Sequence, residues 1–196
     1  MRVIAGSLRS RSLQAPPGLA TRPTSDRLRE TLFNVLAPRM ERCHFLDLYA
    51  GSGAVGIEAL SRGAERVVFV ERAAAPLKVL RANLGRLGLE DGFEIHAGTT
   101  SAFLRHEVWR PGFDVVFLDP PYEAANEYEA VLGLLGCDDR GLLRQGGVVI
   151  AEHRRKEKLS DSFGALARTR LLQQGDAALS FYAISNPDSE EPKGNA

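Results

Sequence analysis

The chain has 196 residues and a formal net charge of zero, with 44% hydrophobic and 26% charged residues. That balance is typical of a soluble globular protein, and the length suits one domain with a sizeable core. The sequence holds no run of about eighteen apolar residues and starts without the apolar stretch of a secretory signal. Its two cysteines, with no paired Cys spacing or His-rich cluster, argue against a disulfide framework and a metal site. We therefore expect a cytoplasmic, metal-free protein that does not enter membranes, and a monomer because no interface stripe is evident.

The positive charge is concentrated at one end of the chain. Residues 1–42 contain eight arginines, three acidic residues and no lysine, a formal charge of +5 that the remainder balances. A planar guanidinium group can bind two phosphate oxygens at once, so this arm is expected to contact phosphates. A solvated, arginine-rich surface remains the alternative on charge alone.

Short elements are expected within this arm, which we delimit as residues 1–42. Residues 2–5 and 12–14 could form a small hairpin. Thr24, Ser25 and Asp26 then offer caps for a helix that carries a stripe of leucines and ends near Pro38.

Strand and helix patterns alternate through residues 43–186, the second predicted unit. The strands are expected at 45–50, 67–71, 93–97, 113–119, 147–153, 165–173 and 178–185. Leu77, Leu80, Leu84 and Leu87 fall on one stripe of a helix, which Gly88 is expected to end. Such alternation predicts an α/β fold with a mainly parallel sheet of seven strands, an antiparallel last strand and helices on both faces. Residues 187–196 lack apolar side chains and are expected to be a disordered tail.

A GxGxxG pattern follows the first strand of this unit. Gly51, Gly53 and Gly56 would let the backbone turn sharply and approach a ligand with a ribose, and Glu71 ends the next strand. A nicotinamide dehydrogenase is compatible with these residues. Asp47 argues against it, because a buried carboxylate needs a partner and would repel a pyrophosphate. An ammonium group of a zwitterionic ligand is one possible partner, and a backbone group or an arginine is another.

The most specific motif is Asp119-Pro120-Pro121-Tyr122, directly after an apolar strand. The prolines stiffen the turn, so Asp119 and the Pro120 carbonyl can both accept hydrogen bonds from one base amino group. Those bonds would take the nitrogen lone pair out of conjugation and prepare it to attack a sulfonium methyl group. Tyr122 offers an aromatic face to a base displaced from its stack. An ordinary turn is the simpler alternative.

Several segments resemble a known group of enzymes. DLYAGSG (47–53), VFVE (68–71) and LDPPY (118–122) are similar to the Rossmann-like S-adenosylmethionine methyltransferases that act on nucleotide amines. TRPTSDRLRETLFNVL (21–36) and GDAALSFY (175–182) narrow the resemblance to the bacterial enzymes that make N2-methylguanine in 16S ribosomal RNA. The similarity covers about residues 1–185, nearly the whole chain.

The resemblance implies S-adenosylmethionine as cofactor and a guanine held by Asp119, Pro120, Pro121 and Tyr122. The residues expected at the cofactor are Asp47, Tyr49, Gly51, Ser52, Gly53, Glu71, Arg72, Gly98, Thr99 and Thr100. The family often has Gly-Asp-Ala where this chain has Gly98-Thr99-Thr100, so the acidic residue that helps to position adenine is absent here.

The implied function is methyl transfer to guanine N2 in 16S ribosomal RNA, in the assembling small subunit. The RNA contacts are expected from Arg9, Arg11, Arg22, Arg29, Arg154 and Arg155. Two other functions stay open: methylation of adenine N6 in DNA, and a nucleotide-binding or RNA-binding module without catalysis. The sequence leaves undecided which nucleotide is modified and whether Asp119 removes a proton.

Overall fold

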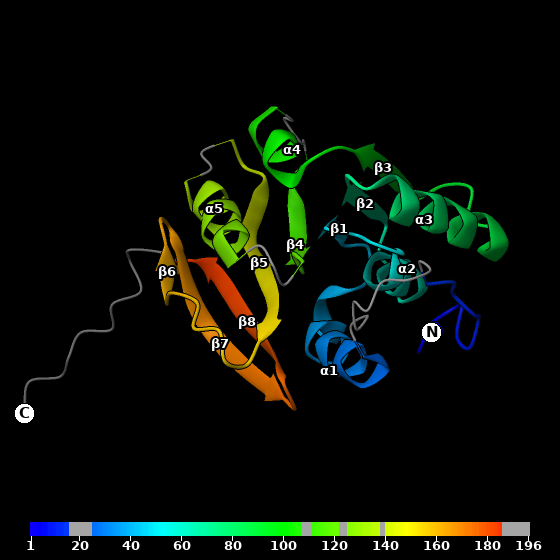
Figure 1. Cartoon of the computed structure of the whole chain (residues 1–196), viewed down its shortest axis with the longest axis horizontal. Coiled ribbons are helices and arrows are strands. Elements are labelled where there is room, and N and C mark those ends of the chain that lie inside the picture. Colours follow the sequence, from blue (N-terminus) through cyan, green and yellow to red (C-terminus); the bar gives the residue numbers. More distant parts are fainter. Residues whose placement is uncertain (16–24, 107–110, 122–124, 138–139, 186–196) are drawn as a thin grey trace, which may run out of the picture.

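The computed structural model describes residues 1–15, 25–106, 111–121, 125–137 and 140–185. A single sheet runs through the molecule, and helices cover both of its faces (Figure 1). The helices are α1 (Asp26–Leu36), the 3-10 helix η1 (Ala37–Arg39), α2 (Ala54–Ser61), α3 (Ala74–Leu87), α4 (Thr100–His106) and α5 (Ala125–Gly136). The strands are β1 (His44–Leu48), β2 (Arg66–Glu71), β3 (Phe93–Ala97), β4 (Phe113–Leu118), β5 (Leu143–Arg154), β6 (Ser162–Phe163), β7 (Leu166–Gln174) and β8 (Ala177–Ile184).

The strand order is β3-β2-β1-β4-β5-β8-β7-β6. The first five strands in this order are parallel, and β8 is antiparallel to both of its neighbours. The prediction of a mainly parallel sheet with an antiparallel last strand is therefore confirmed. The sheet has eight strands rather than seven because β6 pairs with the start of β7. A strand of two residues is too short to produce a pattern of alternating side chains in the sequence.

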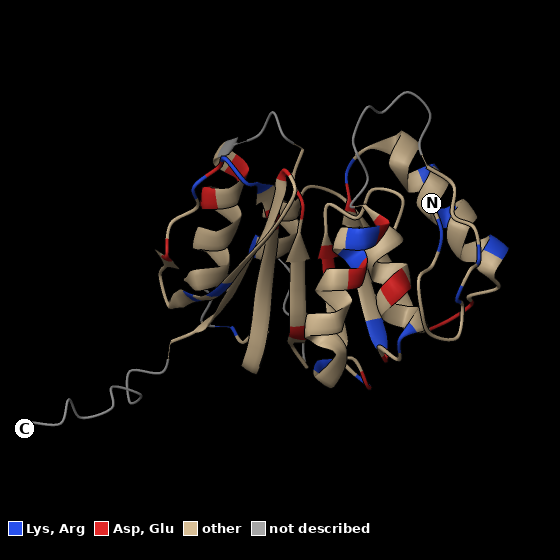
Figure 2. Cartoon of the chain, turned by 90° about the horizontal axis from the view of Figure 1, so that it is seen from below, with Lys and Arg blue, Asp and Glu red and all other residues tan. Residues whose placement is uncertain are grey.

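Each face of the sheet has its own core. The first face lies under α1, α2, α3 and the N-terminal residues, and its strand side chains include Phe45, Phe117 and Ile150. The second face lies under α4 and α5, with Leu46 and Leu118 among its strand side chains. Side chains alternate along a strand, so Asp47 and Glu152, two positions after Phe45 and Ile150, point to the first face as well. Figure 2 shows these helical layers on either side of the strands.

Helix α1 begins as its sequence predicts. The Ser25 hydroxyl accepts a hydrogen bond from the Leu28 N–H at 3.1 Å, which satisfies one of the free amides of the first turn. The 3-10 helix with Pro38 follows its last turn. The expected N-terminal hairpin is reduced to one antiparallel bridge between Arg2 and Ser12. None of the helices in the described ranges is both long and apolar enough to cross a membrane.

Candidate active site

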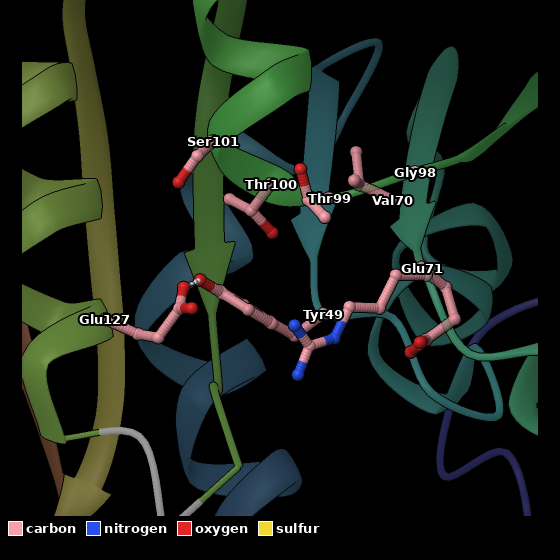
Figure 3. A pocket seen from close by; sticks show the side chains of 9 residues that line it. Tyr49, Val70, Glu71, Gly98, Thr99, Thr100, Ser101 and Glu127 are labelled. Atoms are coloured by element: carbon pink, nitrogen blue, oxygen red, sulfur yellow. Dashed lines mark hydrogen bonds between the residues drawn. The ribbon is translucent and has the colours of Figure 1, made fainter.

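The carboxyl ends of β1, β2 and β4 meet at one edge of the sheet, where open parallel sheets bind ligands. A cavity of about 210 Å³ lies at this edge. Figure 3 shows its lining side chains, which come from the end of β2, from the segments after β1, β2 and β3, and from α4 and α5. The lining residues are Tyr49, Val70, Glu71, Arg72, Gly98, Thr99, Thr100, Ser101 and Glu127. Six of these were expected at a cofactor; Val70, Ser101 and Glu127 were not.

The GxGxxG segment forms the turn from β1 into α2, as predicted. Gly53 has a φ of +82°, and a Cβ there would lie 2.3 Å from Leu80 Cδ1 of α3. A Cβ on Gly56 would lie only 2.2 Å from Cε1 of Phe69 on β2. The first position needs glycine for its backbone and the second for close helix–strand packing. The turn is therefore tightly packed against the elements behind it.

Glu71 ends β2 with its carboxylate bound by backbone amides. Its Oε2 accepts from the Gly51 N–H at 2.9 Å, and its Oε1 accepts from the Ala73 N–H at 2.7 Å. Two charge-assisted bonds of this kind hold the carboxylate in one orientation. An oriented carboxylate at the cavity wall can accept hydrogen bonds from the hydroxyls of a ribose.

Asp47 lies on β1 and is 2% exposed. Its Oδ2 accepts a hydrogen bond from the Gly56 N–H at 2.9 Å, so its partner in this structure is a backbone amide. Burial raises the pKa of Asp47 from 3.8 to about 7; the Gly56 bond opposes this shift and the Glu71 carboxylate adds to it. One amide therefore compensates the buried charge only in part, and a bound cation would complete the compensation.

Asp119 follows β4 directly and is half-buried. Burial raises its pKa well above the usual range, and the carboxylates of Glu152 and Asp47 add to the shift. The alternation along β1 and β5 directs Asp47 and Glu152 to the first face of the sheet, and Asp119, directly after β4 between them, lies close enough for both charges to act on it. Three carboxyl groups on adjacent strands fit a positively charged ligand better than an anionic one. Pro120 is buried and Pro121 exposed, whereas Tyr122 lies outside the described residues.

Thr99 and Thr100 line the cavity where α4 begins. Thr99 Oγ accepts from the Ala102 N–H at 3.2 Å and so caps α4, and Thr100 is buried. Across the cavity the Tyr49 hydroxyl donates to Glu127 Oε2 at 2.5 Å, as Figure 3 shows. Burial, followed by this bond, raises the pKa of Tyr49. Glu127 lies in the first turn of α5, shortly after the Asp-Pro-Pro-Tyr motif. Its closeness to that motif in the sequence is the signal that could have identified it as a site residue.

The structure corrects the expected role of Arg29. Its side chain is fully buried, and it donates to the Arg2 carbonyl at 2.5 Å and to Asp26 Oδ1 at 3.1 Å. Its Nε lies 3.7 Å from the buried carboxylate of Glu58 on α2. Arg29 directly follows Leu28 on the buried side of α1, so it joins helices instead of contacting RNA phosphates.

The other predicted RNA-binding arginines fall at two places. Arg9 and Arg11 are exposed, but Arg11 donates to the Arg86 carbonyl in the last turn of α3, at the opposite edge of the sheet from Asp119. Arg154 and Arg155 are exposed at the end of β5, on the same edge as Asp119. Arg22 lies outside the described residues. Figure 2 shows basic and acidic segments interspersed over the molecule.

Within the described ranges, no group of three or more His, Cys, Asp or Glu side chains is arranged to hold a metal ion. The site offers a ligand carboxylates, backbone amides and hydroxyl groups.

Comparisons with known proteins give consistent matches. The curated relative YlbH of Bacillus subtilis is 38% identical over 183 residues, which cover 93% of this chain and 98% of the relative. Ribosomal RNA small subunit methyltransferase D of Haemophilus influenzae is 41% identical over 143 residues, 72% of this chain and 73% of the relative. The solved structure of yhhF from Escherichia coli superposes with a TM-score of 0.82 at 32% identity, covering 94% of this chain and 97% of that one.

A protein-family model described as Conserved hypothetical protein 95 matches residues 1–183. Together with relatives of this identity and coverage, the match shows that the chain belongs to this family, the family of ribosomal RNA small subunit methyltransferase D.

Proposed function

We propose that this chain transfers a methyl group from S-adenosylmethionine to the exocyclic N2 of a guanine in 16S ribosomal RNA. The observation that carries the proposal is the position of Asp119 at the end of β4, next to a ligand site built from Asp47, the glycine turn and Glu71. The names of the relatives support ribosomal RNA as the substrate. The assembling small subunit in the cytoplasm is the substrate particle that we propose.

The residues present fit S-adenosylmethionine. When bound, this cofactor supplies an electrophilic methyl group on a positively charged sulfur. Glu71 would accept hydrogen bonds from its ribose, and Asp47 would face its ammonium group. Thr99 and Thr100 lie where the family places an acidic residue near adenine, and their hydroxyls can donate or accept. A cation in this site would lower the raised pKa values of Asp47 and Asp119.

Asp119 and the Pro120 carbonyl would each accept a hydrogen bond from one N–H of the guanine amino group. Their role is to orient the amine and to free its lone pair, a contribution of positioning and hydrogen bonding rather than of covalent catalysis. As the N–C bond forms, the S–C bond of the cofactor would break and S-adenosylhomocysteine would leave; the methylated nitrogen would then have to release one proton. An ionised Asp119 is the nearest group of this motif that can accept it.

Arg154 and Arg155 would contact the RNA backbone beside the target base. They follow β5 at the edge that carries Asp119, so phosphate contacts there would position the RNA without reading its sequence. Arg9 and Arg11 would contact phosphates in a part of the RNA farther from the target base.

The test is transfer of labelled methyl from S-adenosylmethionine to small ribosomal subunits that lack the modification, with naked 16S RNA and duplex DNA as parallel substrates. We expect label in N2-methylguanine after digestion to nucleosides, and more label in the particle than in naked RNA. Label in N6-methyladenine of DNA would replace the proposed target. No transfer to any nucleic acid despite cofactor binding would refute the enzymatic function.

A further inference from the structure

Asn83 is a buried polar residue on an otherwise apolar stripe of α3. It lies between Leu80 and Leu84, and only 1% of its surface is exposed. A buried amide costs free energy unless its polar atoms find partners. The partners of Asn83 therefore indicate why an amide occupies this position.

The Asn83 side chain joins two distant segments. Its Nδ2 donates to the Ser52 carbonyl at 2.9 Å and to the Gln14 carbonyl at 3.1 Å, and its Oδ1 accepts from the Gln14 N–H at 2.8 Å. Both hydrogens of the amide are thus used. Ser52 lies between Gly51 and Gly53, the first two glycines of the turn after β1. Gln14 belongs to the N-terminal segment, residues 1–15.

The bond to Ser52 fixes one peptide plane of the glycine turn. Because a peptide unit is planar, the Ser52 carbonyl and the Gly53 N–H move together. The Gly53 N–H donates to the Ala50 carbonyl at 2.8 Å, so this plane is held from both sides. The neighbouring Gly51 N–H is the one that binds Glu71. The orientation of the turn therefore depends on Asn83, on the Ala50 carbonyl just after β1, and on Glu71 at the end of β2.

The N-terminal segment is attached to the helices by four buried side chains, those of Arg29, Glu58, Ser61 and Asn83. Arg29 of α1 donates to the Arg2 carbonyl at 2.5 Å. Glu58 of α2 accepts from the N–H groups of Ile4 and Ala5 at 2.8 and 3.0 Å. Ser61, at the end of α2, accepts from the Leu8 N–H at 3.0 Å and donates to the Ala5 carbonyl at 2.6 Å. Of these four attachments in the described structure, the one at Asn83 also bonds the glycine turn.

We propose that Asn83 is a positioning residue that makes the N-terminal segment a structural part of the cofactor site. It ties Gln14 to the Ser52 carbonyl, so the segment predicted to meet RNA and the turn predicted to meet the cofactor share one side chain. The identity of the cofactor in this inference rests on the proposed function. The positioning of the turn itself does not.

The experiment compares Asn83→Ala with Ser61→Ala in the full chain. Both changes remove side-chain bonds between a buried residue and the N-terminal segment, but only Asn83 contacts the glycine turn, so Ser61→Ala is the matched control. The first readout is amide hydrogen exchange of residues 50–56 without ligand. The second is the dissociation constant of S-adenosylhomocysteine, measured by calorimetry, which needs no methyl transfer.

We expect faster exchange of the glycine turn and about tenfold weaker binding for Asn83→Ala, the factor that corresponds to roughly 1.4 kcal/mol. Ser61→Ala should lower the melting temperature while leaving both readouts unchanged. Asn83→Ser keeps one hydroxyl donor and should fall between wild type and Asn83→Ala, so it serves if the alanine variant does not fold.

The inference would be overturned if amide exchange of residues 50–56 were unchanged in the Asn83 variants. It would also be overturned if Ser61→Ala accelerated this exchange as much as Asn83→Ala does. Failure of the wild-type protein to bind S-adenosylhomocysteine would instead refute the cofactor of the proposed function. In that case the exchange measurement still decides the role of Asn83.

Discussion

The two halves of the candidate site are held in different ways. On the side proposed to bind the cofactor (the cofactor side: Asp47, residues 51–53 and Glu71), both carboxylates accept hydrogen bonds from backbone amides. On the side proposed to bind the target base (the substrate side: residues 119–121 and Glu152), burial and neighbouring carboxylates raise the pKa of Asp119. Backbone amides thus orient the carboxylates of the first half, whereas burial and the charges of Glu152 and Asp47 dominate the surroundings of Asp119 in the second.

This difference suggests an order of events for the proposed reaction. A cation bound on the cofactor side would lower the pKa of Asp119 and favour its ionised form, which is the better hydrogen-bond acceptor. Asp47 contributes to the shift of Asp119, so the two sides are linked by charge as well as by neighbouring strands. Cofactor binding would then prepare the substrate side for the amine.

The largest expected effect is on the substrate side. Asp119→Ala removes the acceptor for the target amine and should reduce methyl transfer by about 10²-fold or more. Binding of S-adenosylhomocysteine should change little, because the contacts of Glu71 and the glycine turn remain. Transfer to small subunits and calorimetry with the same preparations check both parts. Retention of more than about a tenth of the activity would contradict the assignment of Asp119.

The cofactor side gives the next largest effect. Glu71→Gln replaces one carboxylate oxygen and removes the charge from a group that accepts two backbone hydrogen bonds. Bonds to charged groups contribute about 1.5–3 kcal/mol, so affinity for S-adenosylhomocysteine should fall roughly 10- to 100-fold. Glu94→Gln on the adjacent strand changes an exposed ion pair with Arg66 and should leave the affinity unaltered. Equal affinities of wild type and Glu71→Gln would show that Glu71 does not bind the ribose.

Much of the cofactor side could be predicted from the sequence because its signals are local. The glycine spacing, the strand before it and Glu71 at the end of the next strand all follow short-range rules of backbone geometry and burial. The structure confirms the turn, and it places Glu71 at the cavity. The contacts to Glu127 and Asn83 depend on segments far apart in the chain, which no local pattern contains.

Arg29 illustrates the limit of reasoning from charge. The excess of arginine in residues 1–42 predicts a phosphate-binding surface, but helix periodicity turns this arginine toward the core, where Glu58 and Asp26 compensate it. In α3 the sequence does indicate a buried polar contact, because Asn83 interrupts the leucine stripe at a buried position. A polar residue within an apolar stripe is a sequence signal for a buried hydrogen-bond partner. The division at residue 42 and the RNA contacts of the other arginines stay predictions.

A smaller effect concerns stability on the cofactor side. Because the pKa of Asp47 is raised to about 7 in the folded protein, between pH 3.8 and about 7 the folded state binds a proton that the unfolded state has lost. The free energy of unfolding should therefore fall as pH rises through this range, by at most about 1.4 kcal/mol per pH unit from this group. Asp47→Asn should flatten that part of the dependence in urea unfolding across the range. An identical slope in wild type and variant would show that Asp47 titrates normally.

The smallest expected effect is that of the Glu152 charge on the pKa of Asp119. Glu152 is 3% exposed on β5, and it raises the pKa of Asp119 more than Asp47 does. Glu152→Gln keeps the size and polarity of the side chain but removes its charge, so the pKa of Asp119 should fall. If methyl transfer needs an ionised Asp119, the acid limb of its kcat profile should move to lower pH, while the affinity for S-adenosylhomocysteine changes little. Glu129→Gln, an exposed change on α5, should leave the limb in place. A limb that stays fixed in both variants would assign the titration to another group and would leave Asp119 with an orienting role alone.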